Sequence, residues 1–339
     1  MRFPLSLTRS MTAYIVRKRL AGAKKFPLVL MLEPLHACNL SCSGCGRIRE
    51  YADTVDQRLS VEECLDALGE CGAPIVSICG GEPLIYPDIE LLVAKILAAR
   101  KHVYLCTNGL LLEKRLHGFP PGHRLMINVH LDGMEATHDR MANRRGVFAA
   151  AVRGIEAAKR AGFVVCTNTT VYKDTDMHEI AVLFAYLTQL GVDGLMISPA
   201  YGYQAVEQSN PDGAADIFMT RAEVRRKFRR ARNLLARFKL TASPIYMDFL
   251  YGRRDLPCAA WANPTYNVRG WRKPCYLIAD DHYRTYRELV DKTDWERLGP
   301  GEDPRCEHCL VHCGFEPAAV LAADRRIGDI LRMAVWQMT

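Results

Sequence analysis

Short apolar runs alternate along the chain with segments of helical pattern, and this alternation restricts the possible folds more than any other feature. The first run, residues 28–33, reads Leu-Val-Leu-Met-Leu-Glu with no polar alternation, as expected of a strand buried on both faces of a parallel sheet. Similar runs lie at residues 75–79, 103–107, 125–131, 163–169 and 195–198, and helical patterns such as 61–71 and 147–161 fill most of the gaps. The sequence therefore predicts βαβ crossovers and a parallel sheet, open or closed into a barrel, with its chemistry at the carboxyl ends of the strands.

The length and the distribution of residue types suit one such sheet domain with a smaller appended piece. Of 339 residues, 49% are hydrophobic and 24% are charged, which is typical of a globular protein with a large core. A basic helix is expected over residues 221–239, and beyond residue 240 the chain is richer in Pro, Trp and Cys. We therefore expect a basic N-terminal segment (1–25), a barrel (26–240) and a C-terminal cysteine-containing domain (241–339).

The number of cysteines and the net charge indicate in which compartment the protein works and which partners it binds. Arg9, Arg17, Lys18 and Arg19 interrupt the apolar residues near the start before they reach signal-peptide length, and no stretch approaches the roughly 20 apolar residues of a membrane span. The thirteen cysteines are then expected to be reduced thiols, metal ligands or redox groups in a cytoplasmic protein. The net charge of +7 is modest and the basic residues are not interleaved with aromatics, which argues against nucleic acid as a partner.

Three cysteines follow the first predicted strand within one short loop. The segment Cys38-Asn-Leu-Ser-Cys42-Ser-Gly-Cys45 brings three thiolates to the edge of the sheet where ligands bind. A cubane cluster needs four ligands, and three cysteines at this spacing leave one iron open to a small molecule. Free buried cysteines or a zinc site are the alternatives, although zinc sites usually combine one Cys-x2-Cys pair with a second pair. The loop therefore predicts a 4Fe-4S cluster on Cys38, Cys42 and Cys45.

This loop resembles the signature of the radical S-adenosylmethionine (SAM) superfamily, and the resemblance extends to later strand ends. After the second strand, Gly80-Gly81-Glu82-Pro83 is similar to the segment that contacts the methionine amino group, where glycines admit close backbone approach and Glu82 accepts ammonium hydrogen bonds. After the fourth strand, His130-Leu-Asp132-Gly133 resembles the segment near the ribose, and Asn168 and Thr170 occupy the next strand end. Simple capping of strand ends is the alternative for these later positions. The resemblance implies SAM as cofactor and a partial (β/α)6 TIM-like barrel of the radical SAM type with a smaller cysteine-bearing C-terminal extension.

One position departs from that signature. The superfamily usually has an aromatic residue just before the third cysteine, where it can stack on adenine, and here Gly44 stands in that place. An aromatic surface for adenine must then come from elsewhere in the chain, and the sequence does not indicate where.

Several local runs, spread over almost the whole chain, carry a closer resemblance. They are residues 26–34, the glycine-bearing cysteine loop, and residues 57–64, 103–108, 247–249, 270–271, 274–277 and 311–316. Together they resemble the adenosylhopane synthase (adenosyl-hopene transferase) family of hopanoid biosynthesis. The resemblance implies that the 5'-deoxyadenosyl radical adds to the terminal alkene of a pentacyclic triterpene, diploptene. It also implies a reductant such as flavodoxin or ferredoxin.

That reaction needs a hydrogen-atom donor, because addition to an alkene leaves a carbon radical. A thiol is the best donor among ordinary side chains, and Cys106 lies at the end of the third strand, outside both cysteine clusters. Cys106 is therefore the candidate catalytic residue, with a small buried strand residue as the alternative. Cys64, Cys71, Cys79 and Cys166 lie in helix or strand patterns, where packing is the simpler interpretation.

A hydrocarbon substrate resides in a bilayer, so the resemblance implies peripheral contact with the inner face of the cytoplasmic membrane. Leu7, Met11, Tyr14 and Ile15 share one helical face beside basic residues, and the helix at 221–239 is rich in arginine, which suits anionic lipid. For both segments, the outer face of a barrel helix in water is the alternative.

A second group of cysteines lies near the C-terminus. Cys306-Glu-His-Cys309-Leu-Val-His-Cys313 is preceded by Cys275 and Cys258, and the group resembles the auxiliary-cluster extensions of some radical enzymes. The resemblance implies a second iron-sulfur cluster on Cys275, Cys306, Cys309 and Cys313. Zinc is the alternative, with His308 and His312 as further possible ligands.

Two other functions remain open from the sequence. One is a peptide- or carbohydrate-modifying radical SAM enzyme with an auxiliary cluster, which would abstract hydrogen and need no lipid-facing surface. The other is an iron-sulfur or zinc binding module without catalysis, which would have no use for the Gly80–Pro83 segment.

Overall fold

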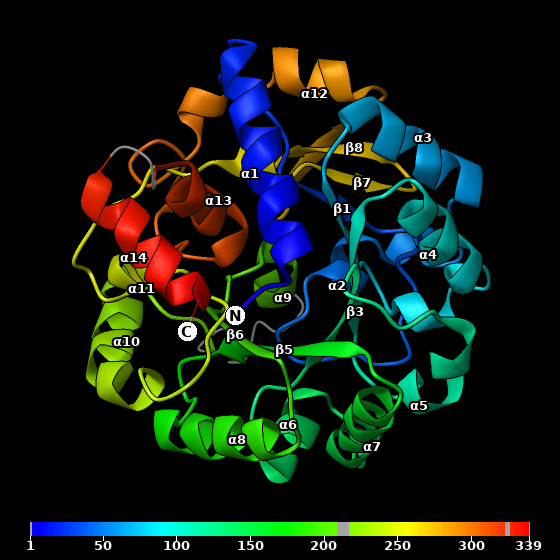
Figure 1. The fold of residues 1–339 in the computed structure, drawn as a ribbon, viewed down its shortest axis with the longest axis vertical. Coiled ribbons are helices and arrows are strands. Elements are labelled where there is room, and N and C mark those ends of the chain that lie inside the picture. The colour runs from blue at the N-terminus through cyan, green and yellow to red at the C-terminus, as the bar shows by residue number, and fades with distance from the viewer. Residues whose placement is uncertain (1, 209–216, 323–325, 339) are drawn as a thin grey trace.

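A parallel sheet curved into a partial barrel forms the centre of the molecule (Figure 1). The computed structural model describes residues 2–208, 217–322 and 326–338. Six strands follow one another in space as in sequence, and each pairs in parallel with the next. They are β1 (Val29–Leu32), β2 (Ile75–Ile78), β3 (His102–Thr107), β4 (Leu125–His130), β5 (Val164–Val171) and β6 (Gly194–Pro199). All six apolar runs predicted as strands are confirmed.

Helices connect the strands and form a ring around the sheet, as Figure 1 shows for α3, α4, α7 and α8. The helix predicted at 61–71 is α3 (Val61–Cys71), which begins with a capping box of Ser60 and Glu63 and ends at Gly72, with φ +67°. The helix predicted at 147–161 is α7 (Val147–Arg160). The other barrel helices are α2 (Arg47–Glu50), α4 (Ile89–Ala98), α5 (Leu112–Arg115), α6 (Glu135–Met141), α8 (Met177–Gln189) and α9 (Gln204–Gln208).

The inside of the barrel is layered along the strands. At the amino ends of the strands, Ile75 and Met126 pack against Leu7 of α1 (Leu5–Leu20), so apolar side chains close this end. Strand register and hydrogen bonds to Cys106 define the next layer. We call it the middle layer, and it consists of Ser77, Cys106, Asn128 and Cys166.

The packing of α1 corrects the expectation that its apolar face meets a membrane. Leu7 and Tyr14 are buried, and Met11 and Ile15 are partly buried against the barrel core. Side chains that pack on the barrel cannot also enter lipid. Within the described ranges, no helix combines the length and the apolar character that a bilayer crossing requires.

The basic segment expected at 221–239 forms α10 (Arg221–Leu235), which begins at the N-cap Thr220. Its predicted apolar face is confirmed, because Val224, Phe228, Ala231 and Leu235 are all buried. The helix packs beside α8 on the outside of the barrel (Figure 1).

The C-terminal segment extends the barrel sheet and does not form a sheet of its own. Strand β7 (Thr265–Asn267) pairs in parallel with β1, and β8 (Gly270–Pro274) and β9 (Ala279–Tyr283) follow in antiparallel order. This arrangement places the segment next to the strand from which the cysteine loop starts. Its helices are α11 (Pro244–Leu250), α12 (Tyr286–Lys292), α13 (His312–Ala322) and α14 (Ile327–Met338). The predicted α/β class, a partial barrel with a C-terminal extension, is confirmed.

Candidate functional site

The loop after β1 places Cys38, Cys42 and Cys45 at the carboxyl edge of the sheet. Side chains from neighbouring segments hold its backbone. The Arg49 guanidinium donates to the carbonyl oxygens of Cys42 and Cys45, and the Asn143 amide donates to a further loop carbonyl at 2.7 Å. The three thiols therefore share one fixed loop.

The chemistry of these thiols fits an iron-sulfur cluster. Burial, together with the charge of neighbouring thiolates, raises the pKa of Cys38 to about 11 and that of Cys42 to about 12. Glu82 adds another negative charge near Cys38. Three thiolates in this loop would repel one another, and the positive charge of iron ions would offset that repulsion.

Two glycines allow the end of β2 to lie directly against the cysteine loop. Gly80 has φ +107°, and a Cβ there would lie 2.5 Å from the carbonyl oxygen of Leu35. A Cβ at Gly81 would lie 2.5 Å from the carbonyl carbon of Ala37. The N–H of Gly81 donates to Leu35 at 3.1 Å, and the N–H of Glu82 donates to Ala37 at 2.9 Å. The glycines were predicted to allow close backbone approach. In the structure, the backbone that they approach is that of the chain's own cysteine loop.

The Glu82 carboxylate lies at this contact and accepts bonds from the next strand. The residue is 1% exposed. Its Oε1 accepts from the N–H of Leu84 (3.0 Å) and the hydroxyl of Thr107 (2.7 Å), and its Oε2 accepts from the N–H of Asn108 (2.8 Å). Burial raises the pKa of Glu82, and these bonds oppose the rise. A carboxylate has about four acceptor positions, and three donors already bind to Glu82. The role of Glu82 at the methionine ammonium stays a prediction. Pro83 begins the short 3-10 helix that follows (Pro83–Ile85).

The residues predicted on the ribose side come together at the ends of β4 and β5. His130 Nε2 lies 2.8 Å from Asp132 Oδ2, and Asp132 Oδ1 accepts from the N–H of Thr170 at 2.9 Å. The Asn168 amide lies 3.4 Å from His130 Nδ1. Burial disfavours both charges, but the attraction between them prevails, so the pKa of His130 is raised and that of Asp132 is lowered. We call these four residues the strand-end network.

A buried ion pair beside the cysteine loop was missed by the sequence reasoning. Arg47 Nε lies 2.7 Å from Glu33 Oε1, and both side chains are almost fully buried. The guanidinium lies 4.3 Å from the ring centroid of Tyr276 and donates to its carbonyl oxygen. Two features of the sequence point to this ion pair. Glu33 is a charged residue at the end of the first apolar run, and Arg47 is a charged residue just after the third cysteine. Because Tyr276 adjoins Cys275, the pair connects the cysteine loop to the C-terminal cysteines.

Cys106 lies inside the barrel, in the middle layer and below the strand-end network. Its sulfur is 3.5 Å from the hydroxyl of Ser77 and 3.8 Å from the amide nitrogen of Asn128. Burial raises the pKa of Cys106, so the group is a thiol at neutral pH. The cysteines expected to serve packing are all buried, namely Cys64, Cys71, Cys79 and Cys166.

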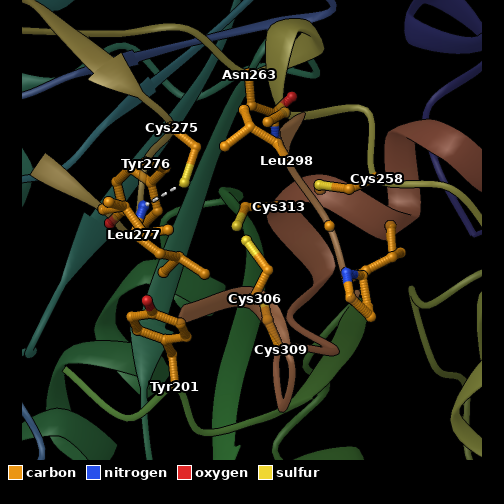
Figure 2. A pocket seen from close by; sticks show the side chains of 16 residues that line it. Tyr201, Cys258, Asn263, Cys275, Tyr276, Leu277, Leu298, Cys306, Cys309 and Cys313 are labelled. Carbon is orange, nitrogen blue, oxygen red and sulfur yellow. Dashed lines mark hydrogen bonds between the residues drawn. The ribbon is translucent and has the colours of Figure 1, made fainter. Parts of the chain in front are cut away.

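Five cysteines line one pocket in the C-terminal segment (Figure 2). Cys275 follows β8, Cys306 ends a short 3-10 helix (Pro304–Cys306) and Cys313 lies in α13. Figure 2 shows their thiols pointing into a common space, with Cys258 opposite. Burial raises the pKa of Cys306 to about 11 and that of Cys309 to about 12. The four predicted ligands are brought together, and Cys258 is a fifth thiol outside the predicted set.

The two histidines considered for zinc do not line this pocket. His308 is exposed and lies beside Thr220 and Arg221, and burial lowers the pKa of His312 to about 4. In the part of the chain that the structure describes, no three His, Cys, Asp or Glu side chains are arranged to hold a single metal ion. The metal-ligating side chains that face the pocket are thiols, the ligands of iron-sulfur clusters.

Two family models match the chain. Residues 32–187 match the radical SAM superfamily, and residues 195–333 match a domain of unknown function, DUF3463. The first match contains the three loop cysteines, the Gly80–Pro83 segment and the strand-end network. This part of the chain is a radical SAM domain. The superfamily consists of enzymes, and the match implies a 4Fe-4S cluster and SAM.

Relatives of known function match less than half of the chain. An AdoMet-dependent heme synthase of Methanosarcina barkeri is 31% identical over 170 residues, which are 49% of this chain and 48% of the relative. A GTP 3',8-cyclase of Xanthomonas axonopodis pv. citri is 34% identical over 144 residues, which are 40% of this chain and 43% of the relative. The chain thus spans about half the length of these curated relatives. They do not bear on hopene adenosylation, which stays a proposal.

Solved structures share the fold across the C-terminal segment as well. SuiB of Streptococcus suis superposes with a TM-score of 0.62 at 16% identity, covering 92% of this chain and 78% of SuiB. The structure of anSMEcpe with bound AdoMet and a Cp18Cys peptide superposes with a TM-score of 0.53 at 14% identity, covering 92% of this chain and 100% of the other. At these identities the likeness concerns the fold alone.

Proposed function

We propose that this chain is a radical SAM enzyme that cleaves SAM reductively and joins the 5'-deoxyadenosyl group to the terminal alkene of diploptene, giving adenosylhopane. The observation that carries the proposal is the thiol of Cys106, which lies inside the barrel below the strand-end network. A 4Fe-4S cluster on the three loop cysteines would supply the electron for cleavage.

The thiol gives this reaction the hydrogen atom that it needs. Addition of a primary carbon radical to the alkene forms one carbon–carbon bond and leaves an unpaired electron on the neighbouring carbon. Transfer of the hydrogen atom from Cys106 completes the saturated product and leaves a thiyl radical. One electron and one proton then restore the thiol, and a flavodoxin or ferredoxin is the proposed source of that electron. Because burial raises the pKa of Cys106, the S–H bond is present at neutral pH.

The inside of the barrel also suits an uncharged substrate. The middle layer contains no charged side chain, and the layer beneath it is apolar. Two pairs of opposite charges lie near the edge, His130 with Asp132 and Arg47 with Glu33. A substrate that carries phosphate or carboxylate groups would need cations without partners, whereas a hydrocarbon needs none.

A substrate that resides in a bilayer requires contact with lipid, and α10 is the proposed contact. Arg226, Arg230 and Arg232 are exposed on this helix. Lys227 of the same helix donates to the carbonyl oxygens of Tyr172 at 3.2 Å and of Thr175 at 2.7 Å, which places the helix beside the carboxyl edge of the barrel. Positive charge at that edge supports binding to anionic lipid.

We further propose that the C-terminal pocket binds a second 4Fe-4S cluster through Cys275, Cys306, Cys309 and Cys313. Support comes from the thiols that share the pocket and from the absence of both histidines among its described lining residues.

The test is anaerobic reconstitution of the full chain with iron and sulfide, followed by SAM, dithionite and diploptene. We expect an adenosyl adduct of diploptene by mass spectrometry. Free 5'-deoxyadenosine as the sole product would favour a peptide- or carbohydrate-modifying enzyme, and no cleavage of SAM would favour a binding module. Either result overturns the proposal.

Variants of the middle layer test the role of Cys106. In heavy water the thiol exchanges, so the adduct should gain one deuterium. Cys106→Ala should still cleave SAM but yield no saturated adduct. Cys166→Ala is the matched control, because it removes a buried thiol from the same layer and should leave the adduct yield unchanged. Full yield from Cys106→Ala would eliminate the donor role.

A further inference from the structure

An aromatic ring from a distant part of the chain fills the space beside Gly44 in the cysteine loop. A Cβ at residue 44 would lie 2.6 Å from Cε1 and 2.8 Å from Cζ of Tyr172, distances at which the atoms would overlap. The hydroxyl end of the Tyr172 ring therefore lies where a side chain of residue 44 would begin, at the position just before Cys45.

Tyr172 is held firmly in this place. It directly follows β5, and its N–H donates to the hydroxyl of Thr175 at 2.8 Å. Its carbonyl oxygen accepts from Lys227 of α10 at 3.2 Å, and its ring lies 6.4 Å from that of Phe218. A side chain at the end of a strand, supported by such bonds, is positioned in advance for binding.

The ring lies between the cysteine loop and the strand-end network. Burial raises the pKa of Tyr172 well above its usual value, and the negative charges of Asp132, Cys42 and Cys45 act in the same direction. Thr170, two residues earlier, donates its N–H to Asp132. A SAM molecule that reached both the open iron and this network would pass the ring.

A second aromatic ring, that of Tyr203, packs beside the residue that follows Cys45. A Cβ at Gly46 would lie 2.9 Å from Cβ of Tyr203. The ring of Tyr203 lies 6.0 Å from the Arg47 guanidinium, on the side of the buried ion pair. Tyr172 is therefore the loop-packed ring that borders the strand-end network.

We propose that Tyr172 provides the aromatic surface on which the adenine of SAM stacks. A flat base gains free energy on an aromatic face, and the Tyr172 ring stands beside the cysteine loop, two residues after Thr170 of the strand-end network. The proposal rests on the use of SAM by the radical SAM domain and not on the identity of the acceptor, so hopene chemistry can fail without affecting it.

The test measures binding in the absence of any acceptor. Dissociation constants for SAM and for L-methionine, which lacks adenine, are determined by anaerobic equilibrium dialysis on the reconstituted full chain with matched iron content. Stacking of one base contributes about 1–3 kcal/mol, which corresponds to about 5- to 150-fold in affinity. Tyr172→Leu, which keeps bulk against the loop, should weaken SAM by that factor and leave methionine unchanged. Tyr172→Phe should stay within about 2-fold of the wild type, because it keeps the ring.

Two outcomes would overturn the proposal: Tyr172→Leu with the wild-type affinity for SAM, or an equal loss for SAM and methionine, which would mean that the ring only supports the loop. A rescue experiment adds a second arm. Gly44→Tyr alone should clash with Tyr172 and weaken SAM binding, whereas Gly44→Tyr combined with Tyr172→Ala should bind SAM more tightly than Tyr172→Ala alone. A double variant that binds no better than Tyr172→Ala would also contradict the proposal.

Discussion

Replacing Gly81 by alanine should separate the end of β2 from the cysteine loop. The new Cβ would overlap the carbonyl oxygen of Ala37 and would lie 2.5 Å from the carbonyl carbon of Ala37 and 2.6 Å from the carbonyl oxygen of His36, so the two backbones must part by more than about 1 Å to reach ordinary contact. That movement stretches two bonds beyond hydrogen-bonding distance, from Gly81 to Leu35 (3.1 Å) and from Glu82 to Ala37 (2.9 Å). Two buried bonds lost at about 1–3 kcal/mol each should lower the free energy of unfolding by about 2–6 kcal/mol.

Chemical denaturation and iron content after anaerobic reconstitution measure this effect. Gly69→Ala is the matched control, because residue 69 lies in α3 with nothing within 4 Å of an added Cβ, and alanine there should stabilise the helix by up to about 1 kcal/mol. Gly81→Ala should also bind less iron, since the loop that carries Cys38 moves. Equal stability and equal iron in the two variants would refute the argument.

The remaining predictions concern the C-terminal segment. Cys306→Ala should lower the iron content by about four atoms per chain, whereas Cys258→Ala should keep it, and iron analysis that shows the same content in both would contradict the proposed ligand set. Burial raises the pKa of Glu316 to about 7 from 4.5, so the folded chain keeps this proton while the unfolded chain loses it, and stability should fall as the pH rises between those values. Glu316→Gln, which keeps the acceptor for the N–H of Ser243 (3.0 Å), should remove that fall and add up to about 3 kcal/mol above pH 7. If Glu316→Gln and the wild type showed the same pH dependence of stability in denaturation experiments, the proton on Glu316 would be excluded as the cause of the fall.

The barrel could be predicted from the sequence because each strand is covered on both faces and therefore carries a largely apolar run. The C-terminal strands lack that signal. β7 has only three residues, and β9 lies largely exposed and carries Asp280 and Asp281. Their place in the sheet depends on the pairing of Met31 with Thr265, a contact between distant segments that no local pattern announces.

Site residues could be predicted where they directly follow one strand. Contacts between two distant segments could not be predicted. The three cysteines and the strand-end residues follow their strands directly, and parallel strands end at one edge. Two of the three donors to Glu82 come from the end of the next strand, and the ring beside Gly44 belongs to the residue that follows β5. Helical periodicity likewise identified the apolar face of α1, but periodicity does not tell whether lipid or the barrel covers a face.

The electron paramagnetic resonance spectrum of the reduced chain tests most directly whether the loop cysteines present an iron to SAM. The spectrum is recorded with and without SAM, in a Cys306→Ala background to isolate the loop cluster. We predict a 4Fe-4S signal that changes when SAM is added, and the loss of that signal when Cys42→Ala is introduced into the same background. A signal that SAM leaves unchanged would contradict the account.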